Sequence, residues 1–117
     1  MSEEEIRNFV KRFYEALDAG DAETASALFP DGTEIYLWDG KTFRTQAEFR
    51  AWFEELRSTS DDAKREVVKF EVEGNVAYVE VVLKANHKGK KEVVKLKHEF
   101  EFEGDKVVKV RVEIKPL

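Results

Sequence analysis

The segment from Val94 to Glu103 alternates between two kinds of residue without a break. One set is Val94, Leu96, His98, Phe100 and Phe102, and the other is Lys95, Lys97, Glu99, Glu101 and Glu103. Successive side chains of a β-strand point to opposite faces of a sheet, so this pattern predicts a strand with one buried and one hydrated face. The row Val108, Val110, Val112 and Ile114 repeats it. The chain is therefore expected to build a sheet that is covered on one side only.

The second half of the chain reads as a series of such strands. Helical periodicity disappears from about Lys64 onward, and Gly74-Asn75, Lys88-Gly89 and Gly104-Asp105 are turn signals that divide this half into four strands. Strands joined by tight turns run antiparallel, so we predict an antiparallel meander. The expected inward row of its first strand is Val68, Phe70 and Val72.

The first half shows helical spacing instead. Ser2 and Glu5 have the spacing of a capping box, and Asp21 is placed to cap a second, short helix from Ala22 to Phe29. The apolar stripe of the first helix is Ile6, Phe9, Val10, Phe13 and Leu17. Two helices that form a bent pair are therefore predicted before the first strand.

A hairpin and a third helix follow. Asp39-Gly40 is a strong two-residue hairpin signal between the strand-like runs 33–38 and 41–43. Thr45 and Glu48 form a second capping box that opens a helix, which the polar residues 58–62 should end. Its apolar face is Phe49, Trp52, Phe53 and Leu56. Capping, turn chemistry and periodicity agree almost everywhere, as they do in designed sequences.

Composition excludes several classes of function. A chain of 117 residues is expected to form a single domain, residues 1–117, and its formal charge of -5 argues against nucleic-acid binding. There is no cysteine, which excludes disulfides and thiolate chemistry. No apolar run is long enough to span a membrane, and the acidic N-terminus does not resemble a secretion signal. We expect a soluble cytoplasmic monomer whose charged outer sheet face stays in water.

His98 breaks the pattern because it stands between Leu96 and Phe100 in an inward apolar row. A buried imidazole needs a hydrogen-bond partner. Tyr14 flanks the apolar stripe of the first helix, so its hydroxyl could reach His98. The alternatives are a histidine satisfied for structural reasons and an ordinary tyrosine with its oxygen in solvent.

Asp18 is a second exception, because the C-terminal turn of a helix disfavours a carboxylate. Arg65 is a candidate partner, since a guanidinium matches a carboxylate in two places. Strict alternation places Arg65 on the outer face, and only a bulge or an irregular strand start would turn it inward. The alternative for both residues is plain surface charge.

His87 should be exposed beside its turn, and with only two histidines no metal site is expected.

The order helix, helix, hairpin, helix and long meander resembles the nuclear-transport-factor-2-like, or ketosteroid-isomerase-like, family over essentially the whole chain. This resemblance implies an α+β cone in which three N-terminal helices pack on a curved antiparallel sheet. It also implies an apolar pocket between the two layers, of the kind that holds flat apolar molecules.

On that fold, the set Tyr14, Asp18, Arg65 and His98 resembles the de novo designed luciferases of the LuxSit series. The resemblance implies oxidation of diphenylterazine, a synthetic imidazopyrazinone luciferin and coelenterazine analogue, by molecular oxygen without metal or organic cofactor. It assigns His98 and Tyr14 to an ionisable nitrogen of the heterocycle and Arg65, oriented by Asp18, to the anionic core.

The same resemblance makes Leu96 and Val110 apolar walls of the pocket. Phe13, Trp38 and Trp52 are further expected substrate contacts, although aromatic residues in such patterns more often pack in a core. Ser60 is expected in the loop after the third helix. It departs from the pattern of the designed luciferases, in which an arginine can occupy this position. Charge stabilisation would then depend on Arg65 and the His98–Tyr14 pair.

Two other functions remain open from the sequence. A designed scaffold could bind an apolar ligand without turnover, with His98–Tyr14 as a buried hydrogen-bond pair only. A general acid–base enzyme of the isomerase or dehydratase type could use Asp18 or His98 as its base. No carboxylate stands clearly on an inward strand row, so the sequence gives the acid–base alternative little support.

Overall fold

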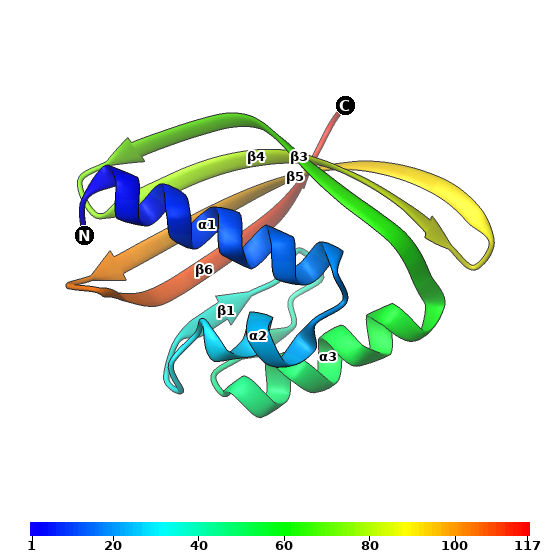
Figure 1. Ribbon diagram of the computed structural model, residues 1–117, viewed down its shortest axis with the longest axis horizontal. Coiled ribbons are helices and arrows are strands. Elements are labelled where there is room, and N and C mark those ends of the chain that lie inside the picture. The colour runs from blue at the N-terminus through cyan, green and yellow to red at the C-terminus, as the bar shows by residue number, and fades with distance from the viewer.

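The computed structural model describes residues 1–117 as three helices on one side of a six-stranded sheet. The helices are α1 (Glu3–Asp18), α2 (Ala22–Ala27) and α3 (Gln46–Thr59). The strands are β1 (Glu34–Tyr36), β2 (Thr42–Phe43), β3 (Ser60–Glu73), β4 (Val76–His87), β5 (Lys90–Glu103) and β6 (Lys106–Lys115). The long strands arch over α1, with α2 and α3 beneath it (Figure 1).

Both capping boxes are present, at Ser2 and at Thr45, and they begin α1 and α3 as predicted. The second helix is shorter than expected and ends at Ala27. Beyond it the backbone N–H groups of Leu28 and Phe29 bond to carbonyls three residues back, which tightens the chain out of the α-helix. Phe29 is nevertheless buried.

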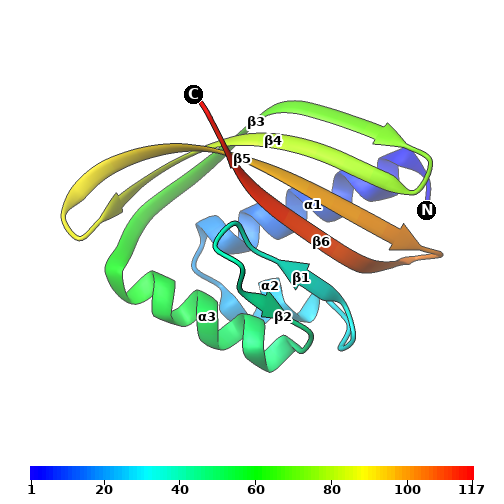
Figure 2. The same ribbon diagram turned by 180° about the vertical axis from the view of Figure 1, so that it is seen from behind.

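The strand order is β2-β1-β6-β5-β4-β3, and β3 to β6 form the predicted antiparallel meander. The prediction of a wholly antiparallel sheet is wrong at one place, because β1 pairs with β6 in parallel. The β1–β2 hairpin is present with shorter strands than predicted, and it lies beside α2 and α3 (Figure 2).

A bulge changes which valines of β6 are buried. Glu101 pairs with Lys109 but Phe102 pairs with Val107, so one extra residue lies in β6 at this point. The expected inward residue Val108 is only half-buried there, and Val107 takes its place in the core. The side chains on the two sides of a bulge alternate out of phase with each other. The regular alternation of the sequence in β6 gives no sign of this change.

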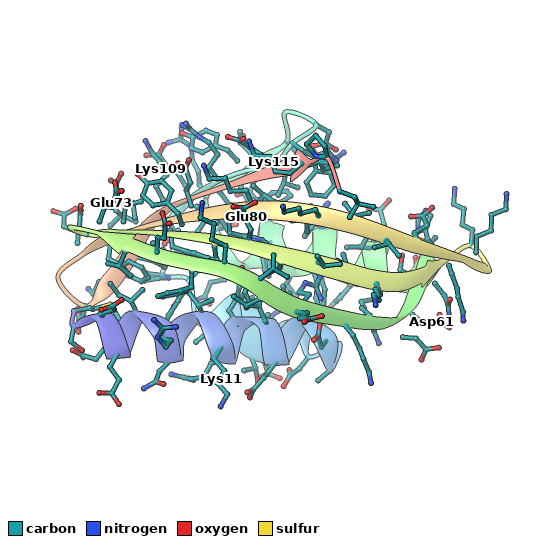
Figure 3. The ribbon with its side chains drawn as sticks, turned by 90° about the horizontal axis from the view of Figure 1, so that it is seen from above. Lys11, Asp61, Glu73, Glu80, Lys109 and Lys115 are labelled. Atoms are coloured by element: carbon teal, nitrogen blue, oxygen red, sulfur yellow. The ribbon has the colours of Figure 1, made fainter.

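The core is one cluster of buried apolar residues between helices and sheet. Part of it is aromatic: the ring of Phe13 meets those of Phe29 and Phe100 edge to face. The opposite sheet face is charged, as Glu80 and Lys109 illustrate, and Lys11 points away from the outer side of α1 (Figure 3). None of the helices is long and apolar enough to cross a membrane.

Candidate active site

A bulge in β3 turns Arg65 toward the helices. Arg65 pairs with Leu83 and Val67 with Val81, but Lys69 pairs with Glu80, which leaves Val68 as the extra residue. Val68 is therefore exposed, and its predicted place in the inward row is wrong. The bulge reverses the alternation of the residues before it, so Arg65 lies on the inner face.

Asp18 and Arg65 form an ion pair at the end of α1. The Nη1 of Arg65 donates to Asp18 Oδ1 at 2.7 Å, and the backbone N–H of Arg65 donates to Oδ2 at 3.0 Å. Only 7% of the Arg65 side chain is exposed. Burial lowers the pKa of Arg65 and the Asp18 carboxylate opposes that shift, so the guanidinium stays charged. These contacts stabilise the Asp18 carboxylate, which the negative end of the α1 dipole disfavours.

One donor of this guanidinium is left over. The Nε–H of Arg65 is buried and has no hydrogen-bond partner within the protein. A buried polar group without a partner costs about 1–3 kcal/mol, and more when it is charged. The guanidinium of Arg65 therefore has hydrogen-bonding capacity that the protein does not use.

Tyr14 and His98 form the second polar pair, with the Tyr14 oxygen 3.0 Å from His98 Nδ1. The His98 ring stacks on Phe100 and meets the edge of Phe13. Burial, with the charge of Arg65 as a smaller cause, lowers the pKa of His98 to about 3. Burial also raises the pKa of Tyr14, so both groups are neutral at pH 7.

The direction of this hydrogen bond follows from counting donors. The Tyr14 hydroxyl has no partner other than His98. If the hydroxyl accepted from Nδ1–H, its own buried hydrogen would be left without an acceptor, so the favoured arrangement has Tyr14 donating to Nδ1. A neutral ring then carries its proton on Nε2. His98, like Arg65, is left with a free N–H donor.

An apolar cavity, the inner chamber, connects these pairs. Its volume is about 70 Å³, and fourteen of its sixteen lining residues are hydrophobic. The two polar ones are His98 and Arg65. The walls include all five of the predicted apolar contacts: Phe13, Trp38, Trp52, Leu96 and Val110. Asp18 and Tyr14 do not line the chamber and act through their partners.

A second cavity, the outer chamber, continues from the first. It has a volume of about 270 Å³ and shares Leu17, Trp38, Phe53, Leu56, Arg65, Leu83 and Leu96 with the inner chamber. Ile114 lines it, which explains why an inward residue of β6 is half exposed. Leu83 was not singled out in the sequence, although its two-residue spacing from Val79 and Val81 is the signal that places it inward.

Ser60 and His87 differ from their predicted places. Ser60 is the first residue of β3 and pairs with His87 at the end of β4, where a loop was expected. The Ser60 oxygen lies 2.7 Å from His87 Nδ1, and both side chains line the outer chamber. His87 is half-buried, so the prediction of an exposed residue is wrong.

No group of three or more histidine and carboxylate side chains is arranged to hold a metal ion.

Three helices against a curved, open sheet define the nuclear-transport-factor-2-like class of α+β fold. Within this class, the model of the SnoaL-like domain family matches residues 10–110, and the chain belongs to that family. A comparison with curated protein sequences finds no significant match.

Solved structures share the fold at low sequence identity. An NTF2-like protein of unknown function from Burkholderia pseudomallei has a TM-score of 0.86 at 18% identity, with 98% of this chain and 92% of that chain covered. A putative SnoaL-like polyketide cyclase from Jannaschia sp. CCS1 has a TM-score of 0.84 at 13% identity, covering 98% and 90%. An LEH-like epoxide hydrolase from M. tuberculosis has 0.80 at 14% identity, covering 95% and 83%.

Proposed function

We propose that this chain is a de novo designed luciferase that oxidises an imidazopyrazinone luciferin, diphenylterazine, with molecular oxygen and no metal or organic cofactor. The observation that carries the proposal is the donor set of the inner chamber. His98 and Arg65 are its two polar residues, each has an N–H without a protein partner, and one carries a positive charge. Such a chamber is complementary to a flat apolar molecule that becomes an anion. The designed origin is supported by the agreement of caps, turns and alternation along the sequence.

The chemistry gives these donors a role. The luciferin loses a proton, and its anion forms a carbon–oxygen bond with O₂ to give a peroxide. The peroxide attacks the neighbouring carbonyl carbon, and the bond from that carbon to the ring nitrogen breaks, which gives a dioxetanone. Cleavage of the O–O and C–C bonds of the dioxetanone expels CO₂ and leaves an amide in its excited state. One oxygen atom of O₂ leaves in CO₂ and the other stays in the amide, so no further oxidant is needed.

In this proposal the protein stabilises the anion and keeps water away from the emitter. The Nε2–H of His98 donates to the developing negative charge and the charged guanidinium of Arg65 attracts it, and Tyr14 and Asp18 fix the orientation of these two groups. A low-dielectric chamber strengthens each interaction. Its volume is below the usual range of ligand pockets, about 300–1,000 Å³, so the luciferin must extend into the outer chamber.

The names of two similar structures, a polyketide cyclase and an epoxide hydrolase, raise the alternative of acid–base catalysis. Asp18 is poorly suited to be its base, because both carboxylate oxygens accept hydrogen bonds from Arg65 and the residue lines neither chamber. His98 is poorly suited because Tyr14 occupies its accepting nitrogen. The donor set favours anion stabilisation over proton abstraction.

The test is light emission from purified protein mixed with diphenylterazine in air-equilibrated buffer. We expect emission far above buffer that falls at least about tenfold in Arg65→Met and in His98→Phe, because each variant removes one donor worth about 1.4 kcal/mol or more. Asp105→Asn, at the exposed β5–β6 turn and away from both chambers, is the control. Binding of diphenylterazine without emission would instead identify a ligand-binding scaffold.

A further inference from the structure

The rim of the outer chamber carries a group of polar residues that the proposed chemistry does not use. Ser60 and His87 are hydrogen-bonded there, and Arg57 and Glu92 line the same chamber. Arg57 is in the last turn of α3 and Ser60 begins β3, whereas His87 ends β4 and Glu92 is in β5. The junction of α3 and β3 lies below the β4–β5 hairpin in Figure 1. Of the two chambers, these four residues line only the outer chamber, whereas His98 lines only the inner chamber.

Arg57 is held in place without an ionic partner. It is half-buried, and none of the ion pairs of the protein includes it. Its guanidinium lies against Gly20, where a Cβ would be only 2.5 Å from Nη2. Gly20 has a φ of +70°, so the turn after α1 requires glycine and also leaves room for the arginine.

The rim suits a neutral polar group better than a charged one. Arg57 and Glu92 carry opposite charges at the rim, so a ligand carboxylate held there would gain one attraction and meet one repulsion. Arg65, the third charged residue of the outer chamber, is already paired with Asp18. The Ser60–His87 pair can donate or accept, because the imidazole has two tautomers. With its proton on Nε2, Ser60 donates to Nδ1 and the serine oxygen can still accept; with its proton on Nδ1, Ser60 accepts and the serine hydrogen is free to donate. A phenol hydroxyl, which is both donor and acceptor, matches this pair, with Arg57 as a further donor.

We infer that the Ser60–His87 pair and Arg57 form a specificity site for a hydroxyl group on the outer aryl ring of the ligand. The inference rests on the proposed function in one respect, because it takes the inner chamber as the place of the ligand's anionic end. It predicts that hydroxyaryl ligands bind more tightly than their unsubstituted counterparts.

Binding without turnover tests the inference separately from luciferase activity. The probes are biphenyl-4-carboxylate and 4′-hydroxybiphenyl-4-carboxylate, whose affinities are measured by isothermal titration calorimetry. On this inference, both probes bind with the carboxylate toward His98 and Arg65, and only the second has a hydroxyl for the rim. We expect the hydroxyl to tighten binding roughly fivefold, as one hydrogen bond does.

Variants then locate the preference. Ser60→Ala and His87→Phe should each bring the two probes to within about twofold of each other, whatever the change in the affinity for biphenyl-4-carboxylate itself. Far-UV circular dichroism checks that each variant is folded. Equal affinity of the two probes in the parent protein would overturn the inference. A preference that survives in Ser60→Ala and His87→Phe would overturn it as well, because the hydroxyl would then bind elsewhere.

Discussion

The chemical state of His98 follows from the position of its ring. Phe13 and Phe100 cover the imidazole, and the positively charged Arg65 disfavours a second positive charge beside it. A neutral His98 that accepts from Tyr14 must donate through Nε2. The residue therefore serves as a fixed donor, and we do not expect its protonation to control activity near pH 7.

Acid should destabilise the protein through His98. The unfolded chain gains a proton at this residue near pH 6.5, whereas the folded pKa is about 3. Between these values the unfolded state binds more protons, so stability falls as the pH falls, by about 1.4 kcal/mol per unit at most. Urea unfolding from pH 7 to pH 4.5 should therefore show a shallower loss in His98→Phe than in the parent protein. Parallel profiles would contradict a low pKa for His98.

Tyr14 is expected to stabilise the fold and the orientation of His98 together. In Tyr14→Phe the buried Nδ1 loses its only partner, and we expect a loss of about 1–3 kcal/mol in the free energy of unfolding. Emission should fall because the ring is free to change tautomer. Tyr36→Phe is the matched control, since its hydroxyl bonds to Glu34 on the surface and its removal should change stability much less. Similar losses in both variants would contradict a special role for the buried pair.

At the scale of elements, the bulge in β3 decides whether Arg65 can take part in the site. The β3–β4 turn at Gly74 and Asn75 fixes the register of the strands up to Lys69. The extra residue Val68 then reverses the faces of the residues before it. One exposed valine on an edge strand therefore places the only charged side chain of the inner chamber.

Deleting Val68 tests this dependence. The regular ladder would then continue through Lys69 and turn Arg65 to the outer face, away from Asp18 and the cavity. We expect emission to fall at least as far as in Arg65→Met, with urea unfolding checking that the deletion variant is folded. The substitution Val68→Thr retains the bulge and should keep emission within about threefold of the parent, since it changes an exposed side chain only. Full emission from the deletion variant would contradict this account of Arg65.

The same element shows what the sequence could and could not predict. The caps at Ser2 and Thr45 and the three turn signals are local, so the helix starts and the four long strands were predictable. The bulges at Val68 and in β6 are set by how two strands meet across the sheet, and no local pattern marks them. The parallel pairing of β1 with β6 has the same cause, because it joins segments far apart in the chain.

In the candidate site too, residues marked by a local signal were predictable and contacts set by strand pairing were not. His98 and Asp18 were identifiable because each conflicts with its own element, an apolar row and a helix C-terminus. Their partners Tyr14 and Arg65 were candidates on chemistry alone. The Ser60–His87 contact was not expected, because it depends on β3 starting at Ser60 and on its pairing with the end of β4.

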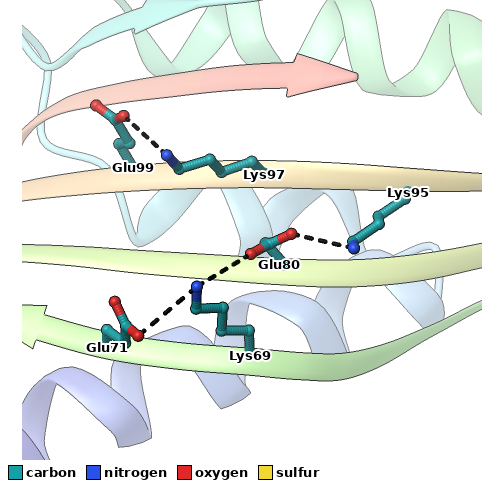
Figure 4. A network of polar contacts seen from close by, with 6 residues as sticks. All are labelled: Lys69, Glu71, Glu80, Lys95, Lys97 and Glu99. Atoms are coloured by element: carbon teal, nitrogen blue, oxygen red, sulfur yellow. Dashed lines mark ion pairs between the residues drawn. The ribbon is translucent and has the colours of Figure 1, made fainter. Parts of the chain in front are cut away.

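At the scale of the whole molecule, ion pairs cover part of the outer face of the sheet. Lys69 lies between Glu71 and Glu80, and Glu80 also meets Lys95 at 3.2 Å, so cations and carboxylates alternate across three strands (Figure 4). An interface with a second copy on this face would have to bury these charged side chains. We expect the protein to be monomeric, which light scattering over a range of concentrations would check.

Glu80 should stabilise the fold weakly and in a way that depends on salt. Its contacts with Lys95 and Lys69 lower the pKa of the carboxyl, so its contribution is present above the unfolded pKa of 4.5 and is lost as the pH falls through the folded value. Glu80→Gln should lower the midpoint of urea unfolding slightly at low ionic strength. In about 1 M NaCl the difference should vanish, because ions screen exposed charges at that concentration. A loss that is unaffected by salt would contradict an electrostatic origin.

The most direct test of anion stabilisation is the pKa of the bound luciferin, measured by absorbance under anaerobic conditions where oxidation cannot proceed. Saturating protein should lower the pKa of diphenylterazine by at least about one unit, which corresponds to about 1.4 kcal/mol in favour of the anion. The shift should be clearly smaller in Arg65→Met, which leaves His98 and the apolar walls in place. A bound luciferin whose pKa is unchanged or raised would contradict the account, because the chamber would then act as an apolar container and not as a site for the anion.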